Sequence, residues 1–142
     1  MLTDHMVRIE DRMIRELDIV ENIHSDDDDW CDPTNLVEVY RDLLEDWDLM
    51  PDEDEDLDTI DYNAVEERAR ESLEDVLSID YERGEPFSVT LTYGGPSIYL
   101  VDLGPFGGEA MRGYWGYEEV VRTGPHVRRL LEYFRGLVEE LY

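Results

Sequence analysis

The chain has no lysine, a single cysteine and no long hydrophobic run. Its 142 residues include 38 acidic side chains against 12 arginines, for a net charge of −26. A single cysteine, Cys31, excludes an internal disulfide. A membrane-spanning helix needs about 20 consecutive apolar residues, and none occur. The acidic start of the chain also lacks the features of a signal peptide. We therefore expect a cytoplasmic protein.

The strong negative charge excludes several partners. Phosphates of DNA, RNA and anionic membranes would be repelled, so direct binding to nucleic acid or membrane is not expected. Hydrophobic residues make up 42 % and aromatic residues 11 % of the chain, which is enough to form a core rather than a disordered acidic tail. The length fits one domain over residues 1–142. Any macromolecular partner is expected to be basic.

The acidic residues are unevenly distributed. Residues 1–82 hold 30 acids and six arginines, a net charge of −24, whereas residues 83–142 hold eight acids and six arginines, a net charge of −2. The acids are densest in Asp26–Asp29 and Asp52–Asp58, where only Leu57 is uncharged. Adaptation to high salt would coat both parts of the chain. The distribution therefore favours localised functional charge, with salt adaptation and a plain solvated surface as alternatives.

Apolar residues at spacings of three and four predict three helices in the acidic part. They run from about Thr3 to His24, from Pro33 through Trp47, and over Tyr62–Leu77. Val76 and Leu77 are expected to face inward at the end of the third helix. Acidic residues are expected on the solvent side of the first helix: Glu10, Asp11, Glu16, Asp18 and Glu21.

After residue 86 the spacing of apolar residues changes from the helical repeat to the alternation of a strand. Residues 87–93, 97–103 and 109–115 read as strands joined by glycine-rich turns, and a short fourth strand over 117–121 is possible. A final amphipathic helix follows Pro125. The sequence thus predicts an α+β fold with three acidic N-terminal helices. A three- to four-stranded antiparallel sheet follows, covered by the C-terminal helix.

Signatures of catalysis are mostly absent. His5, His24 and His126 lack metal-ligand spacing with each other or with Cys31, the glycine pairs do not follow phosphate-loop patterns, and no pair of carboxylates stands out. We expect no enzyme activity and no cofactor. Asp52, Asp54 and Asp56 match the start of a calcium loop. The match is weak, because leucine replaces the required glycine and asparagine replaces the required glutamate.

Rows of acids on the predicted helices indicate a function more clearly than the calcium-loop pattern does. Side chains three or four residues apart on a helix lie about 5–6 Å apart, which is similar to the spacing of phosphates along a nucleic-acid strand. Such rows predict a surface that imitates phosphates, although any acidic amphipathic helix shows them. The candidate partner-binding acids are Asp26, Asp27, Asp28, Asp29, Asp42, Glu45, Asp46, Asp52, Glu53, Asp54, Glu55, Asp56, Glu67, Glu71 and Glu74.

Aromatic residues crowd the segment from Tyr93 to Tyr117. Strand alternation favours core positions for most of them. Tyr114 and Trp115, which glycines flank, are the candidates for an exposed interface together with Tyr117, because tyrosine and tryptophan are frequent interface anchors.

The segments YGGPSIYL (93–100) and GYWG (113–116) resemble parts of small proteins of phages and mobile elements. The small, acidic, motif-poor profile is similar to that of phage-encoded DNA-mimic inhibitors of the anti-restriction and anti-CRISPR type. The resemblance implies a non-enzymatic inhibitor, in the host cytoplasm, that occupies the basic groove of a CRISPR effector or restriction enzyme. It carries over no functional residues. The alternatives are a toxin-neutralising immunity protein and a halophile-adapted accessory protein.

Overall fold

The structure is a computed structural model, and it describes residues 2–23, 33–80, 87–102 and 108–141. These residues form two compact units. Unit 1 comprises Met1–Ile14 and Asp75–Tyr142, and unit 2 comprises Arg15–Glu74. Unit 1 therefore combines the start of the chain with the whole C-terminal half, so the division into units does not coincide with the change in charge after residue 82.

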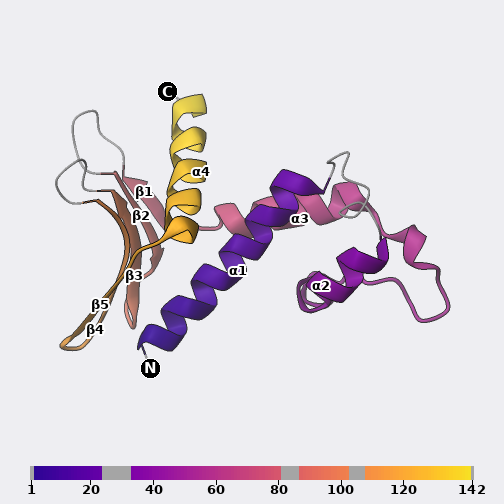
Figure 1. Cartoon of the computed structure of the whole chain (residues 1–142), viewed down its shortest axis with the longest axis horizontal. Helices are drawn as coiled ribbons and strands as arrows, with labels where there is room; N and C mark the ends of the chain where they lie inside the picture. Colours follow the sequence, from indigo (N-terminus) through magenta and orange to yellow (C-terminus); the bar gives the residue numbers. More distant parts are fainter. Residues whose placement is uncertain (1, 24–32, 81–86, 103–107, 142) are drawn as a thin grey trace. The chain divides into compact units, whose positions relative to one another are not determined.

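Among the described elements, the helices and the strands form separate runs along the chain. Their order along the chain is α1 (Leu2–Asn22), α2 (Pro33–Asp46), the 3-10 helix η1 (Leu57–Thr59), α3 (Tyr62–Glu74), β1 (Ser78–Asp80), β2 (Phe87–Thr92), β3 (Ser97–Asp102), β4 (Glu109–Trp115), β5 (Glu118–Arg122) and α4 (Pro125–Leu141). The α+β class is confirmed, with helices first, then an antiparallel sheet and then a helix (Figure 1).

The sheet of unit 1 has five strands in the order β1-β2-β3-β4-β5, and every neighbouring pair is antiparallel. The predicted count of three to four strands is therefore wrong. The missed strand, β1, follows α3 after a short gap. The sequence predicts no strand over 78–80, and it extends the preceding helix to Leu77 because Val76 and Leu77 continue the helical spacing, whereas α3 ends at Glu74. Instead, the Leu77 N–H donates to the Thr90 carbonyl at 2.9 Å, and the Leu77 side chain is exposed rather than inward.

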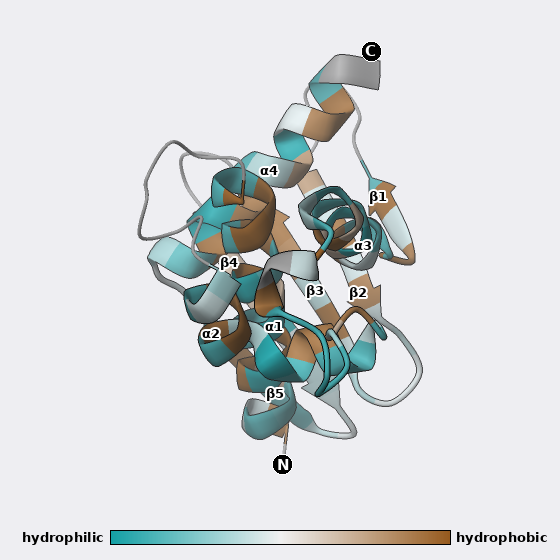
Figure 2. Cartoon of the chain, turned by 90° about the vertical axis from the view of Figure 1, so that its right-hand side faces the viewer, coloured by the Kyte–Doolittle hydropathy of each residue, from teal (hydrophilic) through white to brown (hydrophobic). Residues whose placement is uncertain are grey.

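One face of this sheet is covered by helices. Helix α4 packs against β3 and β4, as predicted, and the first part of α1 lies on the same side (Figure 1). Both α3 and α4 carry hydrophilic as well as hydrophobic residues, as amphipathic helices do (Figure 2). The side chains buried on this side of unit 1 include Met6, Val89, Leu100, Met111 and Phe134. Among the described elements of unit 1, none covers the opposite face (Figure 1).

A glycine permits the close approach of α1 to the sheet. A Cβ atom on Gly113, in β4, would lie 2.5 Å from the sulfur of Met6 and 3.2 Å from Leu2 Cδ1. Met6 and Leu2 are both fully buried, so neither side chain has free space into which to move. Gly113 therefore sets the distance between helix and strand.

Two acids of α1 are buried, against the prediction that they face solvent. Glu10 lies four residues after Met6 and three before Met13, so it falls within the apolar stripe itself. Its charge is compensated by Arg122 of β5, whose Nη2 lies 2.7 Å from Glu10 Oε2. Glu16 is buried as well. The counter-charge for Glu10 is 112 residues away in the sequence, and helical spacing therefore gave no indication of it.

Unit 2 has its own hydrophobic core. It is formed by side chains from α1, α2, the segment around η1, and α3: Ile19, Ile23, Leu36, Val37, Tyr40, Leu43, Leu44, Trp47, Ile60, Val65 and Ala69. Helix α2 ends before Pro51. The N–H groups of Asp48 and Leu49 bind the carbonyls of Glu45 and Leu44, and Asp48 adopts φ +56°. This is a Schellman motif with aspartate where glycine is usual.

Substitution at Gly113 tests the contact between α1 and the sheet. Gly113→Val should lower the free energy of unfolding by about 1–3 kcal/mol, because the added methyl groups overpack Met6 and Leu2. Valine otherwise favours strands, so strand propensity alone predicts that the substitution raises the free energy of unfolding. Urea unfolding followed by circular dichroism measures the effect.

Gly136 provides the matched control. A Cβ atom there meets nothing within 4 Å, and the residue lies within α4. Gly136→Ala should raise the free energy of unfolding by up to about 1 kcal/mol through helix propensity. Equal stability of Gly113→Val and the wild type would contradict the proposed close contact.

Candidate functional site

The excess negative charge is concentrated in unit 2. Its 60 residues include 24 acids and four arginines, a net charge of −20, whereas the 82 residues of unit 1 include 14 acids and eight arginines, a net charge of −6. Every candidate partner-binding acid belongs to unit 2. Asp26–Asp29 lie outside the described residues. The others fall on three segments, which are α2, the loop before η1, and α3.

The acids of α2 are exposed, as the helical spacing predicts. Asp42, Glu45 and Asp46 all face solvent, and so does Glu38, one turn before Asp42. Asp42 and Glu45 are three residues apart in the second part of the helix, so they share one side of it. Glu38 was not among the predicted residues, although its spacing from Asp42 would have identified it.

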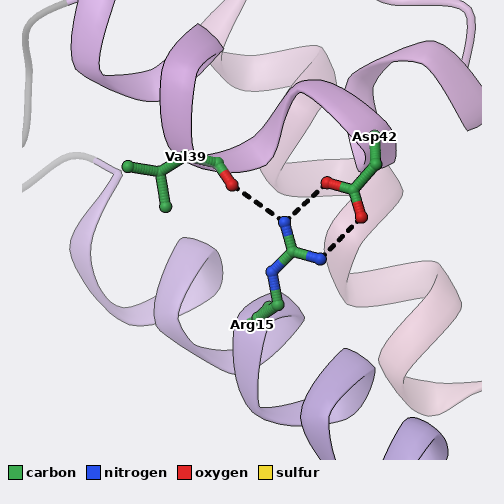
Figure 3. A network of polar contacts seen from close by, with 3 residues as sticks. All are labelled: Arg15, Val39 and Asp42. Atoms are coloured by element: carbon green, nitrogen blue, oxygen red, sulfur yellow. Dashed lines mark hydrogen bonds and ion pairs between the residues drawn. The ribbon is translucent and has the colours of Figure 1, made fainter.

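Asp42 is held by an arginine from another helix. Arg15 of α1 donates from Nη1 to Asp42 Oδ2 at 2.7 Å and from Nη2 to Asp42 Oδ1 at 2.6 Å (Figure 3). This bidentate pair is the geometry in which a guanidinium binds a carboxylate best. The hydrogen bonds from Arg15 lower the pKa of Asp42 from its usual 3.8 to about 2. Asp42 is therefore a charge already compensated within unit 2.

The same guanidinium lies at a kink in α2. Tyr40 has non-helical torsion angles, φ −118° and ψ 21°. Arg15 Nη2 donates to the carbonyl of the preceding residue, Val39, at 2.8 Å (Figure 3). Arg15 Cζ lies 5.6 Å from the centre of the Tyr40 ring. A side chain that binds a helix carbonyl from outside is a known cause of kinks. Arg15 therefore fixes the path of α2 on both sides of the bend.

The acidic run before η1 is exposed but ordered by turns. Asp52, Glu53, Asp54, Glu55 and Asp56 are all exposed. The Glu55 N–H binds the Asp52 carbonyl at 2.9 Å, and the Thr59 hydroxyl donates to the Asp56 carbonyl at 2.7 Å.

Apolar residues follow this run directly. Leu57 packs against the core of unit 2, and Ile60 is part of it. The five carboxylates are thus fixed next to a buried anchor.

Helix α3 presents a further set of acids. Asp61 caps its first turn, accepting hydrogen bonds from the N–H groups of Asn63 and Ala64 at 3.0 and 3.2 Å. Glu67 and Glu71 are exposed and Glu74 is half-buried, so the expected row is present. Arginines on the same helix bind some of the acids: Arg68 lies 3.4 Å from Glu71, and Arg70 lies 2.7 Å from Glu66.

The aromatic candidates belong to unit 1, whereas the acidic set belongs to unit 2. Tyr114 and Trp115 end β4, and both are exposed. The expectation that most aromatics of the segment 93–117 are buried is wrong for the described ones. Tyr93 and Tyr117 are exposed because they lie in turns, whereas Tyr99 lies within β3 and is half-buried.

An open cleft of about 550 Å³ lies in unit 1 where α4 begins. Its lining includes Glu109, Arg128, Arg129 and Glu132, and no histidine is among its described lining residues. Arg128 Nε lies 3.4 Å from Glu109 Oε1. In the described part of the chain, no three histidine, cysteine, aspartate or glutamate side chains are grouped so as to hold a metal ion. None of the described helices has both the length and the apolarity to cross a membrane.

Comparison with protein-family models, with curated proteins and with solved structures finds no match to this chain. The function must therefore be argued from the residues themselves.

The Arg15–Asp42 pair predicts a pH-dependent contribution to stability. Because the folded pKa of Asp42 lies below its usual value, the contribution is complete above about pH 4 and is lost as the pH falls toward 2. The Asp42 side chain is 65 % exposed, so solvent screening limits the contribution to about 0.5–1 kcal/mol. Asp42→Asn should lower the free energy of unfolding by this amount at pH 7, and the difference from wild type should shrink between pH 4 and 2.

Glu45→Gln is the matched control, since it removes one exposed charge from the same helix without changing the contact with Arg15. It should leave stability at pH 7 unchanged or slightly higher, because it reduces repulsion. If urea unfolding gave the same result for Asp42→Asn and Glu45→Gln, the pair would contribute nothing.

Repulsion within unit 2 predicts a dependence on salt. Added salt screens exposed like charges, so the melting temperature should rise between low and moderate ionic strength, by roughly 2–4 °C for each kcal/mol of repulsion removed. Calorimetry or circular dichroism would measure the rise. A melting temperature that stayed flat over this range would contradict dense clustering of charge on unit 2.

Proposed function

We propose that this chain is a non-enzymatic inhibitor of a nucleic-acid-binding protein, either a CRISPR effector or a restriction enzyme. The acidic surface of unit 2 would occupy the basic groove in place of DNA or RNA. The observation that carries the proposal is the net charge of −20 on a single compact unit whose acids are exposed on three segments.

The surface matches the chemistry of such a groove. Arginine and lysine side chains in a nucleic-acid site are arranged to bind phosphate oxygens, and carboxylates offer oxygens of the same charge sign. The acids before η1 supply five exposed carboxylates in five consecutive residues. Glu45 of α2 and Glu67 of α3 add exposed charge from helices. Asp42 has a different role in this proposal, because Arg15 already compensates its charge.

Electrostatics would dominate the association. A strongly negative surface raises the rate of encounter with a basic groove, and the effect falls steeply with ionic strength. No covalent step is needed, since occupation of the groove excludes the nucleic acid. The inhibition would therefore be competitive with DNA or guide RNA.

The uneven charge also bears on salt adaptation. A halophilic surface would coat unit 1 as heavily as unit 2, yet unit 1 has a net charge of only −6 over more residues. This contrast supports a local task for the acids of unit 2.

A competition experiment tests the proposal. The chain would be titrated into a panel of restriction enzymes and guide-loaded CRISPR effectors, each bound to labelled target DNA, with DNA release measured by gel shift. Release is expected for at least one member, and excess DNA should reverse it. Inhibition that excess DNA or added salt does not weaken would contradict the mimicry.

Two variants with equal charge loss make the test specific. The first neutralises the loop with Asp52→Asn, Glu53→Gln, Asp54→Asn and Asp56→Asn. The second neutralises four exposed acids of unit 1 with Asp11→Asn, Asp80→Asn, Glu132→Gln and Glu139→Gln. Each lost contact with a basic groove should cost a few-fold in affinity, so the loop variant should inhibit about 10-fold or more weakly. The unit 1 variant should inhibit almost as well as the wild type; equal weakening would show that only net charge matters.

A further inference from the structure

Four exposed aromatic side chains gather at one end of the sheet in unit 1. We call Tyr93, Tyr114, Trp115 and Tyr117 the aromatic tip. Tyr93 is 76 % exposed, Tyr117 is fully exposed, and Tyr114 and Trp115 are about 40 % exposed. So much exposed aromatic surface is unusual away from an interface, because burial of the large rings of tyrosine and tryptophan gains more free energy than burial of most other side chains.

The topology of the sheet brings these residues together. Tyr93 lies in the turn between β2 and β3, and Tyr117 lies in the turn between β4 and β5. Ser97, which starts β3, pairs with Tyr114 at the end of β4, so both turns lie at the same end of the sheet (Figure 1). Gly116 has φ +63°, a value that allows the tight turn beside Trp115.

Neighbouring rings hold two members of the tip in place. The Tyr114 ring packs edge-to-face with Tyr99, with centroids 6.1 Å apart, and Trp115 packs edge-to-face with His5 of α1 at 5.7 Å. Successive side chains of β4 point to opposite faces of the sheet, so Tyr114 lies on the open face and Trp115 on the face that bears α1. The tip therefore presents fixed aromatic rings around the end of the strand.

Carboxylates outnumber the exposed cations around the tip. Glu118 and Glu119 directly follow Tyr117, and Asp4 lies on α1 one residue before His5; all three are exposed. Arg112, two residues before Tyr114, binds Glu119 at 3.3 Å. An aromatic ring has a negative face that attracts cations, and nearby carboxylates strengthen this attraction. The surface is therefore complementary to a cation.

We propose that the aromatic tip binds arginine or lysine side chains of a basic, extended segment of a partner protein. The rings would supply cation–π contacts, and Glu118 would supply a carboxylate for the same cations, since Arg112 already binds Glu119. A second copy of this chain is a poorer occupant, because each copy carries a net charge of −26. The site does not depend on the function proposed for unit 2, since its residues all belong to unit 1.

A synthetic peptide of alternating arginine and glycine serves as the probe. It would be titrated into the full ¹⁵N-labelled chain at about 0.3 M salt, which screens diffuse attraction to unit 2. The indole N–H of Trp115 should shift in a saturable manner, whereas that of the buried Trp47 should not. The tryptophan signals are assigned beforehand by substitution of each residue.

Paired substitutions at Tyr117 separate cation–π binding from plain hydrophobic contact. Tyr117→Leu should weaken the peptide about 2- to 5-fold, because it removes the π face but keeps an apolar side chain. Tyr117→Phe should bind like the wild type, because it keeps the ring. Both variants should fold, since Tyr117 is fully exposed, and their amide spectra verify it. Glu118→Gln should also weaken binding.

Three outcomes would overturn the proposal. Shifts confined to unit 2 would place cation binding on the acidic surface alone, and the function proposed for that surface would be unaffected. Equal affinity of the leucine and phenylalanine variants would make the tip a general hydrophobic contact. Sedimentation that showed dimers dispersed by Tyr117→Leu would identify a second copy as the occupant. Conversely, a shift of Trp115 without any inhibition of DNA binding would support the tip and contradict only the proposed function.

Discussion

Repulsion among carboxylates is the constraint that unit 2 must satisfy in order to fold. Its 24 acids face four arginines, and three of those arginines, Arg15, Arg68 and Arg70, bind carboxylates of the same unit. Most of the negative charge is thus left to water and salt. Folding stability of a domain is only about 5–15 kcal/mol, so such a charge must be offset by a well-packed core. The core of unit 2 draws on all its described helices, and Leu57 and Ile60 extend it beneath the acidic loop.

Arg15 shows how structure and charge are linked in this unit. Its guanidinium binds both oxygens of Asp42, the Val39 carbonyl beside the kink, and the face of Tyr40. A lysine ammonium is a compact point charge without the planar fork and could not make this set of contacts at once. At this position, therefore, the use of arginine rather than lysine has a structural reason. The kink changes the direction of α2 between Glu38 and Glu45, so Arg15 also sets how the acids of that helix are displayed.

The spacing of apolar residues within a segment predicted most of the helices and strands. Helical spacing indicated α1, α2 and α3, and alternation indicated β2, β3 and β4, because in each case the repeat reflects the buried side of the element itself. The failures come from distant partners. Strand β1 exists because it pairs with β2, with Ser78 opposite Thr90, and Glu10 is buried because Arg122 binds it. The exposed acids were predictable from composition, whereas the compensation of Asp42 by Arg15, 27 residues away, was not.

The separation of charge and aromatic surface into two units has a consequence for selectivity. Long-range attraction raises the rate of encounter with any basic protein, so an acidic surface alone discriminates poorly among basic grooves. Short-range contacts differ from partner to partner, because they require particular side chains at particular places. On the proposals made above, unit 2 would supply the salt-sensitive attraction, and the aromatic tip of unit 1 would supply contacts that are much less sensitive to salt. The lower net charge of unit 1 is then useful in itself, since it weakens the unspecific attraction of cations to the surface around Tyr117 and Trp115. The uneven charge of the chain would thus place long-range attraction on unit 2 and partner-specific contacts on unit 1.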